Sequence, residues 1–234
     1  PSFIEQRDSI LMYHGFDEGR ILIDASVHAE YTNSDESVKA VVEQCREHDL
    51  IMHIHLSETE NEVNECIERR GGKTPVEYFD SLGLFDGPVL AAHSVWLTDN
   101  DYQILKSKNV TVASNPISNL KLVSGICDVK KLMDNGIRVA IGTDSSTSNN
   151  SLDFFEEIKT FALLAKLKSG DPAFMTPKQA LYAATRAGAL AQGRKTSGLI
   201  KEGYRADLIV VDTDVPNMQP SHNMLNNLVY SACG

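Results

Sequence analysis

Polar side chains stand at the ends of several short apolar runs in this sequence. The residues at these positions are His28, His55, His93, Asn115 and Asp144. If the runs are parallel strands, their carboxyl ends share one edge of a sheet, which is where α/β folds build active sites. Imidazole nitrogens bind borderline metals such as zinc, and a carboxylate can complete the ligand set. The pattern therefore predicts a site for a divalent metal at this edge.

Each of these residues also has an ordinary structural interpretation. His28 fits a loop histidine that bonds to backbone, His93 a buried core histidine, and Asp144 the cap of a following helix. His53 and His55 lie two residues apart and so share one face of a strand, either as a metal pair or as core histidines. Taken singly, these residues leave both interpretations open.

Five apolar runs predict the strands that would carry these residues. Each run is rich in valine, isoleucine, leucine or alanine, as strands buried on both faces of a sheet are. They occupy residues 21–27, 50–56, 88–93, 110–114 and 138–143. A sixth strand-like run, ADLIVVD, occupies residues 206–212.

Helical patterns with recognisable ends separate the strands. Ser34 is placed to cap one helix, and Thr176 and Gln179 form a capping box that opens another, which extends through Leu190. A further long helix is expected over residues 152–168. The repeated β-then-α order predicts a parallel sheet with right-handed crossovers. A doubly wound sheet and a (β/α)8 barrel both fit this order.

The composition excludes several classes of partner. The chain has 234 residues, of which 42% are hydrophobic and 23% charged, as in ordinary globular proteins. Its formal net charge is −10, so it offers no basic stripe for nucleic-acid phosphates or for an anionic membrane. No apolar run approaches the roughly 18 residues of a membrane span. We expect a small-molecule substrate, no nucleic acid and no membrane, with a homo-oligomer left open.

The cysteines and the first residues bear on the cellular compartment. The four cysteines are far apart and form no C-x-x-C pair, which indicates a reducing compartment. The opening stretch PSFIEQRDSI carries two acids and lacks the apolar core of a signal peptide. A cytoplasmic protein is therefore expected. Because the sequence does not begin with methionine, a processed chain or a part of a longer protein is expected too.

Five motifs in a fixed order resemble the amidohydrolase superfamily. Within it, they are similar to the branch of 5-methylthioadenosine/S-adenosylhomocysteine deaminases and triazine chlorohydrolases. The motifs are HLSET at 55–59, AAHSVWL at 91–97, NPISNLKL at 115–122, GTDSSTSNNSLDFFEE at 142–157 and ADLIVVD at 206–212. The stretch VHAEYTNS at 27–34 resembles that branch's His-Ala-Pro-Tyr-Thr sequence, with Glu30 in place of the proline. The likeness covers nearly the whole chain.

This resemblance implies an α/β fold, namely an incomplete (β/α)8 barrel of TIM type that comprises the last five β/α units. The family's first strand ends in a His-x-His metal pair, which has no counterpart before residue 21. The first three β/α units are therefore expected to be missing from this chain. We expect a partial catalytic barrel over residues 1–203 and the remnant of a flanking β-sandwich over residues 204–234.

The resemblance also implies roles for individual residues. His55 is similar to the third histidine ligand of the metal, and Asp144 to the carboxylate ligand that also shuttles protons. Glu58 resembles the acid that protonates a ring nitrogen of the substrate, and His93 the histidine that holds the attacking water. By the same likeness His53 is an inward-facing residue one layer deeper and not a ligand. Substrate contacts are implied, besides Glu58 and Asp144, for His28 and Ser148.

The implied reaction is the metal-dependent hydrolytic deamination of an adenosine-type nucleoside such as 5-methylthioadenosine or S-adenosylhomocysteine. A single ion is favoured because residues 21–27 offer no lysine for carbamylation. Zinc is expected, with iron or manganese open, because zinc lowers the pKa of its water to about 7. A triazine chlorohydrolase and a guanine deaminase are the alternatives within the superfamily. A non-catalytic barrel segment is the alternative from another class.

Overall fold

The computed structural model describes residues 9–234. The expectation that the first residues are not a signal peptide falls mainly on residues 1–8, which lie outside the described residues. In the described part of the chain, no helix is both long and apolar enough to cross a membrane.

Five parallel strands form one sheet. They are β1 (Ala25–Val27), β2 (Met52–Leu56), β3 (Val89–His93), β4 (Thr111–Ser114) and β5 (Arg138–Ile141). They lie side by side in chain order, and every neighbouring pair is parallel. This order confirms the predicted consecutive β/α units and excludes a doubly wound sheet, in which the order reverses at a switch point. Each strand is shorter than its apolar run, most of all β1.

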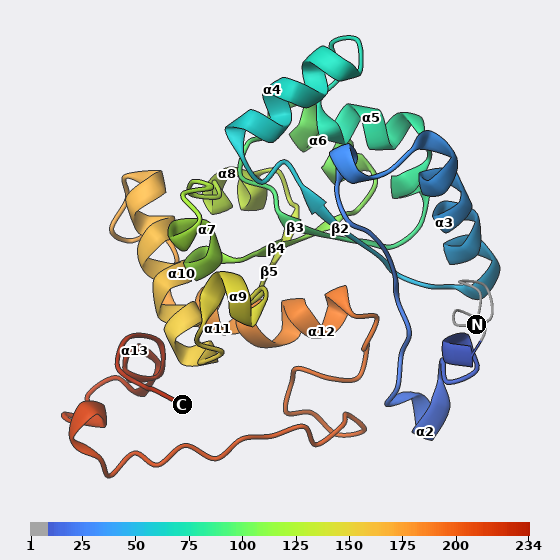
Figure 1. Ribbon diagram of the computed structural model, residues 1–234. Helices are drawn as coiled ribbons and strands as arrows, with labels where there is room; N and C mark the ends of the chain where they lie inside the picture. The colour runs from blue at the N-terminus through green and yellow to red at the C-terminus, as the bar shows by residue number, and fades with distance from the viewer. Residues whose placement is uncertain (1–8) are drawn as a thin grey trace.

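Helices follow the strands along the chain, and Figure 1 shows α3, α4, α5 and α6 together on one side of the sheet. The helices are α2 (Phe16–Gly19), α3 (Asp35–His48), α4 (Glu60–Arg69), α5 (Pro75–Ser81), α6 (Asp99–Ser107), α7 (Pro116–Lys121), α8 (Val129–Asp134), α9 (Ser146–Asn149), α10 (Phe154–Ser169), α11 (Pro177–Tyr182), α12 (Gly188–Ala191) and α13 (Met224–Tyr230). Short 3-10 turns occupy Glu30–Thr32, Leu84–Asp86 and Pro216–Met218.

Capping side chains decide where several helices begin. The Ser34 hydroxyl accepts a hydrogen bond from the Ser37 amide, and Thr176 forms the predicted capping box. The helix expected from residue 152 begins two residues later, because the Asp153 carboxylate accepts from the Phe155 amide and so occupies the capping position. The helix expected through Leu190 is interrupted by a π-helical turn over Ala183–Ala187.

The core lies between the sheet and the helices. In β2, Met52, Ile54 and Leu56 are at most 2% exposed and belong to this core. His53 and His55 alternate with them and point to the other face, where they are half-buried. The strand therefore places its two histidines on the face that the core leaves open.

The strand expected at residues 206–212 is wrong. These residues have no regular secondary structure, and Leu208, Ile209 and Val210 are 63%, 77% and 99% exposed. A strand needs a hydrogen-bonding neighbour, and among the described residues none pairs with this run. Figure 1 shows an extended segment that leads below α12 and α11 to α13, which packs against α10 and α11.

Candidate metal centre

Three side chains with metal-binding atoms meet at the carboxyl edge of the sheet. They are His55 from β2, His93 from β3 and Asp144, which lies shortly after β5. One ligand atom from each lies within 4.8 Å of the others. The His55 and His93 rings are stacked, with their centroids 5.5 Å apart. Strands β2 and β3 are neighbours, so the parallel sheet brings these two rings together directly.

The orientation of His55 is fixed by the loop that follows β1. Its Nδ1 lies 2.8 Å from the backbone carbonyl oxygen of His28, and its amide nitrogen donates to the same oxygen at 3.1 Å. A carbonyl can only accept, so Nδ1 carries the hydrogen in this contact. The lone pair of the neutral ring is then on Nε2, which is free to bind a cation.

His93 is held in the same manner by a different partner. Its ring is 1% exposed, and its Nδ1 lies 2.7 Å from Oδ1 of Asn119, which is on α7. Its Nε2 faces two carboxylates and lies 3.8 Å from Asp144 Oδ2 and 3.8 Å from Glu58 Oε2. A buried imidazole nitrogen between two acids is placed to hold or pass on a proton.

Asp144 is kept ionised by hydrogen bonds. Burial by itself raises the pKa of its carboxyl group, but bonds from the Ser118 hydroxyl and the Ser145 amide and the charge of His93 outweigh it, so its pKa lies below the ordinary value. The Ser118 Oγ lies 2.5 Å from Oδ2, and the Ser145 nitrogen lies 2.7 Å from Oδ1. An ionised carboxylate is the form that binds a metal.

Glu58 stands beside this group at the start of the loop to α4. The Ser124 hydroxyl donates to its Oε1 at 2.9 Å, while Oε2 faces His93. The side chain is 21% exposed, so it is accessible from the open side of the sheet. Glu58 therefore has one carboxylate oxygen bound by Ser124 and the other directed at His93.

The other expected site residues lie around this centre. The His28 ring is exposed and its centroid lies 5.0 Å from that of His55. Ser148, on α9, is 9% exposed and lies 3.3 Å from the Ser145 hydroxyl. The structure places His53 outside the group of donors, with its Nε2 3.1 Å from Oδ2 of Asp24. The roles of these residues stay predictions.

Strained backbone conformations recur at this edge of the sheet, although others lie elsewhere in the described residues. Four residues other than glycine have left-handed φ values here, namely 50° at Ser57, 68° at His93, 48° at Ser94 and 58° at Asp144. Each such residue costs about 1–3 kcal/mol, and strain of this kind clusters at functional sites. In β3, regular alternation would put His93 on the helix side with Ala91. His93 instead has a left-handed φ, and its ring stacks on that of His55.

The donor set fits a divalent metal such as zinc. It offers two imidazole nitrogens and one carboxylate oxygen, which are the ligand types that catalytic zinc sites use. Each imidazole already has a partner at Nδ1, as metal-binding histidines usually do. The family resemblance implies only His55 and Asp144 as ligands, and the structure places His93 within reach of them.

Three residues that support the centre were not singled out from the sequence. Ser118 binds Asp144, Asn119 binds His93 and Ser124 binds Glu58, each through one side-chain hydrogen bond. Ser118 and Asn119 lie on the first turn of α7, three and four residues after the strand-end residue Asn115. That spacing could have indicated them, whereas Ser124 has no local signal, because its contact with Glu58 spans 66 residues.

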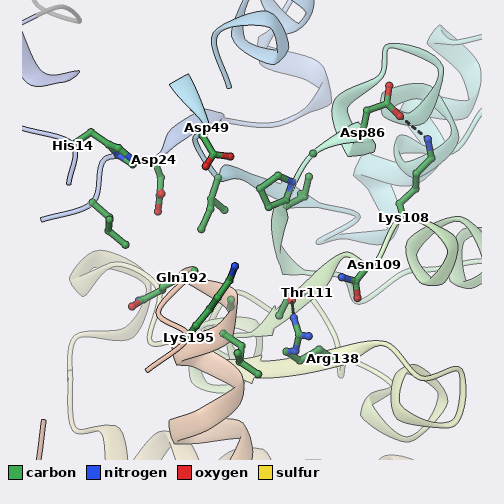
Figure 2. Close-up of a pocket in the computed structure, with 18 residues that line it drawn as sticks. His14, Asp24, Asp49, Asp86, Lys108, Asn109, Thr111, Arg138, Gln192 and Lys195 are labelled. Carbon is green, nitrogen blue, oxygen red and sulfur yellow. Dashed lines mark hydrogen bonds and ion pairs between the residues drawn. The ribbon is translucent and has the colours of Figure 1, made fainter. Parts of the chain in front are cut away.

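A cavity of about 630 Å³ lies at the opposite edge of the sheet (Figure 2). Val89, Thr111 and Arg138, which line it, are at the amino ends of their strands. The charged groups drawn there include pairs such as Lys108 with Asp86 at 2.7 Å. The donor group is absent from its lining, so this cavity is separate from the candidate metal centre.

Comparison with known proteins gives a match along nearly the whole chain. A model of the Amidohydrolase family matches residues 3–234. A 5-methylthioadenosine/S-adenosylhomocysteine deaminase of Dictyoglomus thermophilum is 46% identical over 220 residues, which are 94% of this chain and 51% of that protein. A 5'-deoxyadenosine deaminase of Methanopyrus kandleri is 46% identical over 218 residues, which are 93% of this chain and 50% of that protein.

A solved structure is similar in both fold and sequence. It is that of an adenosine deaminase from Xanthomonas campestris with bound zinc, with a TM-score of 0.93 and 34% identity. The match covers 99% of this chain and 52% of the solved one. The chain thus spans about half the length of the curated relatives and of the solved structure that it matches.

Proposed function

The chain belongs to the amidohydrolase family, and from this premise we propose that the protein containing it deaminates an adenosine-type nucleoside by hydrolysis. The observation that carries the proposal is the group of His55, His93 and Asp144 with Glu58 beside it. Two imidazoles, an ionised carboxylate and a second acid are the parts that hydrolysis of an amidine-like carbon needs.

In this proposal His55 and Asp144 hold one divalent ion, for which zinc is the best candidate. When bound, the ion supplies a positive charge that makes water a stronger nucleophile near neutral pH. The zinc in the solved adenosine deaminase belongs to that protein and supports this choice by likeness. Iron or manganese would suit the same donors.

The side chains then divide the proton transfers between them. His93 Nε2 and the Asp144 carboxylate orient the attacking water, which forms a new bond to C6 of the adenine ring. Glu58 delivers a proton to the adjacent ring nitrogen, with its carboxyl group held by Ser124. Asp144 relays one proton of the water to the departing amino group, so that the C–N bond breaks and ammonia leaves. The second proton of the water is released when the C6 hydroxyl becomes a carbonyl, and it restores the Glu58 carboxyl group.

We propose a nucleoside that is altered at the 5' position of the ribose. The relatives at 46% identity are named for 5-methylthioadenosine, S-adenosylhomocysteine and 5'-deoxyadenosine, which share the adenine and differ at that position. His28, whose ring contacts that of His55, and Ser148, beside Ser145 on α9, are the proposed contacts of this chain with the substrate.

The test is an ammonia-release assay on the intact, zinc-loaded protein with each of these three nucleosides. We expect the corresponding inosine analogue and ammonia in equal amounts, and loss of the reaction after removal of the metal with a chelator. Hydrolysis of a chlorotriazine or guanine in place of the nucleosides would replace this function by one of its alternatives within the superfamily. Inactivity on every substrate with full metal loading would favour a non-catalytic protein.

Three further expectations, on location, partners and domains, complete the proposal. A cytoplasmic location is supported by the free cysteines Cys45, Cys66, Cys127 and Cys233. A small heterocyclic substrate is the proposed partner, with neither nucleic acid nor membrane, and a homo-oligomer is open. Residues 1–203 are proposed as barrel and residues 204–234 as part of a flanking β-sandwich.

A further inference from the structure

Glu30 is a fully buried carboxylate next to the proposed site. It lies in the segment after β1, two residues beyond His28, and its side chain is 0% exposed. Two arginines at the end of α4 reach it: Arg69 Nη2 lies 2.6 Å from Oε2, and Arg70 Nε lies 2.5 Å from Oε1. Both carboxylate oxygens are therefore bound by guanidinium groups.

This arrangement keeps Glu30 charged inside the protein. Burial alone raises the pKa of its carboxyl group, but the hydrogen bonds and charges of Arg69 and Arg70 outweigh burial and hold the pKa below its ordinary value. A buried ion pair gains little stability over a well-packed apolar pair, because both groups lose their water. We therefore explain the ion pairs of Glu30 by the position that they impose on the residues around it.

The ion pairs connect the segment after β1 to the element that follows Glu58. Arg70 also donates to Asp35 at 3.2 Å, and the Tyr78 hydroxyl donates to the same carboxylate oxygen at 2.7 Å. The segment from residue 28 to 35 is thus tied to α4 and α5, which Figure 1 shows beside it. Within the segment, the Ala29 carbonyl accepts from Thr32 and Asn33 at 3.1 and 2.9 Å.

What this segment presents to the site is the carbonyl of His28. That oxygen receives both the amide hydrogen and the Nδ1 hydrogen of His55. The position of one backbone oxygen therefore decides which nitrogen of His55 is left to bind a metal. The carbonyl is only two residues from the carboxylate that the arginines hold.

We propose that Glu30 is a positioning residue for the metal centre, acting with Arg69 and Arg70 to hold the His28 carbonyl against Nδ1 of His55. It touches neither substrate nor metal and acts through His28. This inference rests on the metal-binding part of the proposed function. It does not depend on which nucleoside the protein uses.

The test measures zinc affinity and the His55 tautomer in the intact protein. Zinc dissociation constants come from competition with a chromophoric chelator, and the tautomer comes from nitrogen-15 NMR of the histidine rings in metal-free protein. In Glu30→Gln we expect the zinc dissociation constant to rise about 10- to 100-fold, the range found when partners of ligand side chains are removed. The hydrogen on Nδ1 of His55 should give way to a mixture of tautomers.

Two further variants keep the test decisive. Arg69 is 38% exposed, so Arg69→Gln is expected to fold even if Glu30→Gln does not. It should also raise the zinc dissociation constant. Arg69→Lys retains the charge and should restore part of the affinity. The matched control is Glu43→Gln, which breaks the exposed pair with Arg46 on α3 at 2.5 Å and should change nothing.

The outcomes separate this inference from the proposed function. If Glu30→Gln and Arg69→Gln lower the melting temperature but leave zinc affinity and the His55 tautomer unchanged, the ion pairs are only structural and the inference is wrong. If both variants bind zinc more weakly while the parent protein deaminates no nucleoside, the inference stands and the proposed function fails.

Discussion

Glu58 is the residue at which proton delivery can be separated from metal binding. Replacing it by glutamine keeps the size of the side chain and the oxygen that Ser124 holds, but removes the acidic proton. We expect Glu58→Gln to lower turnover by about 10²–10⁴ if Glu58 is a general acid. Zinc content should stay unchanged, because the donor group is His55, His93 and Asp144.

The measurement is turnover with 5-methylthioadenosine beside zinc content by atomic absorption. Glu60→Gln is a matched control, since Glu60 is exposed in the first turn of α4. Normal turnover in Glu58→Gln would remove Glu58 from the proposed chemistry.

Asn119 is expected to matter because it fixes the ring of His93. Asn119→Ala removes the acceptor 2.7 Å from Nδ1, so the ring can rotate or change tautomer and Nε2 no longer faces the two acids reliably. A loss of about 10- to 100-fold in kcat/KM is expected. Asn135→Ala, at the half-buried C-cap position of α8 and outside the donor group, serves as the control. Unchanged kcat/KM with a rotated ring would show that His93 does not need this orientation.

Glu157 on α10 predicts a pH-dependent stability. Burial raises the pKa of its carboxyl group to about 7, although hydrogen bonds from the Ile117 amide and the Asn149 side chain act in the opposite direction. The folded protein therefore keeps a proton that the unfolded chain releases above its ordinary pKa of 4.5. The free energy of unfolding should fall between pH 4.5 and 7 on account of this group, by about 3 kcal/mol, and stay level above pH 7.

Glu157→Gln should remove this slope, which urea unfolding at several pH values can measure. The difference between parent and variant isolates Glu157 from the other titrating groups. A difference that does not change with pH would mean that the Glu157 carboxyl titrates near its ordinary pKa in the folded protein.

At the scale of elements, the helix starts were predictable because their signals are local. Ser34 and Thr176 cap their helices through hydrogen bonds that span three residues. Strand ends depend on neighbours that are distant in sequence, which is why β1 pairs only over Ala25–Val27 although the apolar run begins at residue 21. For the same reason the run at residues 206–212 looked like a strand and is not one.

The candidate site shows the same division between local and distant signals. His55 and His93 could be predicted because they lie at the carboxyl ends of strands, and Asp144 because it closely follows one. Ser118 and Asn119 have a local signal in their spacing from Asn115, but the side chain that each one orients could not be predicted, because the Ser118 contact with Asp144 and the Asn119 contact with His93 each span 26 residues. Only the packed structure brings α7 against the ends of β3 and β5.

The start of α4 offers a prediction at this scale. Thr59 and Glu62 form a capping box directly after Glu58, and the Glu62 carboxylate also accepts from the Glu58 amide at 2.7 Å. Thr59→Ala should lower the free energy of unfolding by about 1 kcal/mol and loosen the backbone that carries Glu58. Urea unfolding and kcat/KM are the measurements, and Thr59→Ser should restore both. Equal loss in the serine variant would indicate that the threonine methyl group, and not the cap, is responsible.

At the scale of the whole molecule, the sheet has two open edges. Within residues 9–234, β1 and β5 each have a neighbour on one side only. Unpaired strand edges invite pairing with further strands, and a closed family barrel leaves none. In a protein of the relatives' length, we expect further strands to pair with these edges and the exposed residues Leu208, Ile209 and Val210 to be covered.

Zinc retention tests this view of the whole molecule. The described residues bring three donors together, of which the family resemblance implies two as ligands, His55 and Asp144. Catalytic zinc usually has three protein ligands, and the resemblance implies a further His-x-His pair on a strand that has no counterpart in this chain. We therefore expect the 234-residue chain alone to lose zinc readily to a chelator. A protein that also supplies the histidine pair should retain about one zinc per chain.

Equilibrium dialysis followed by atomic absorption compares the two proteins, with circular dichroism as the check that both are folded. Asp144→Asn should reduce retention in the longer protein, because it removes the charge of a ligand held by Ser118 and Ser145. Tight binding by the short chain would instead mean that His93 acts as a third ligand, since its Nε2 lies 3.8 Å from Asp144 and its ring stacks on His55. In that case His93→Ala would abolish zinc binding in the short chain, whereas a water-holding histidine could be removed with the zinc still bound.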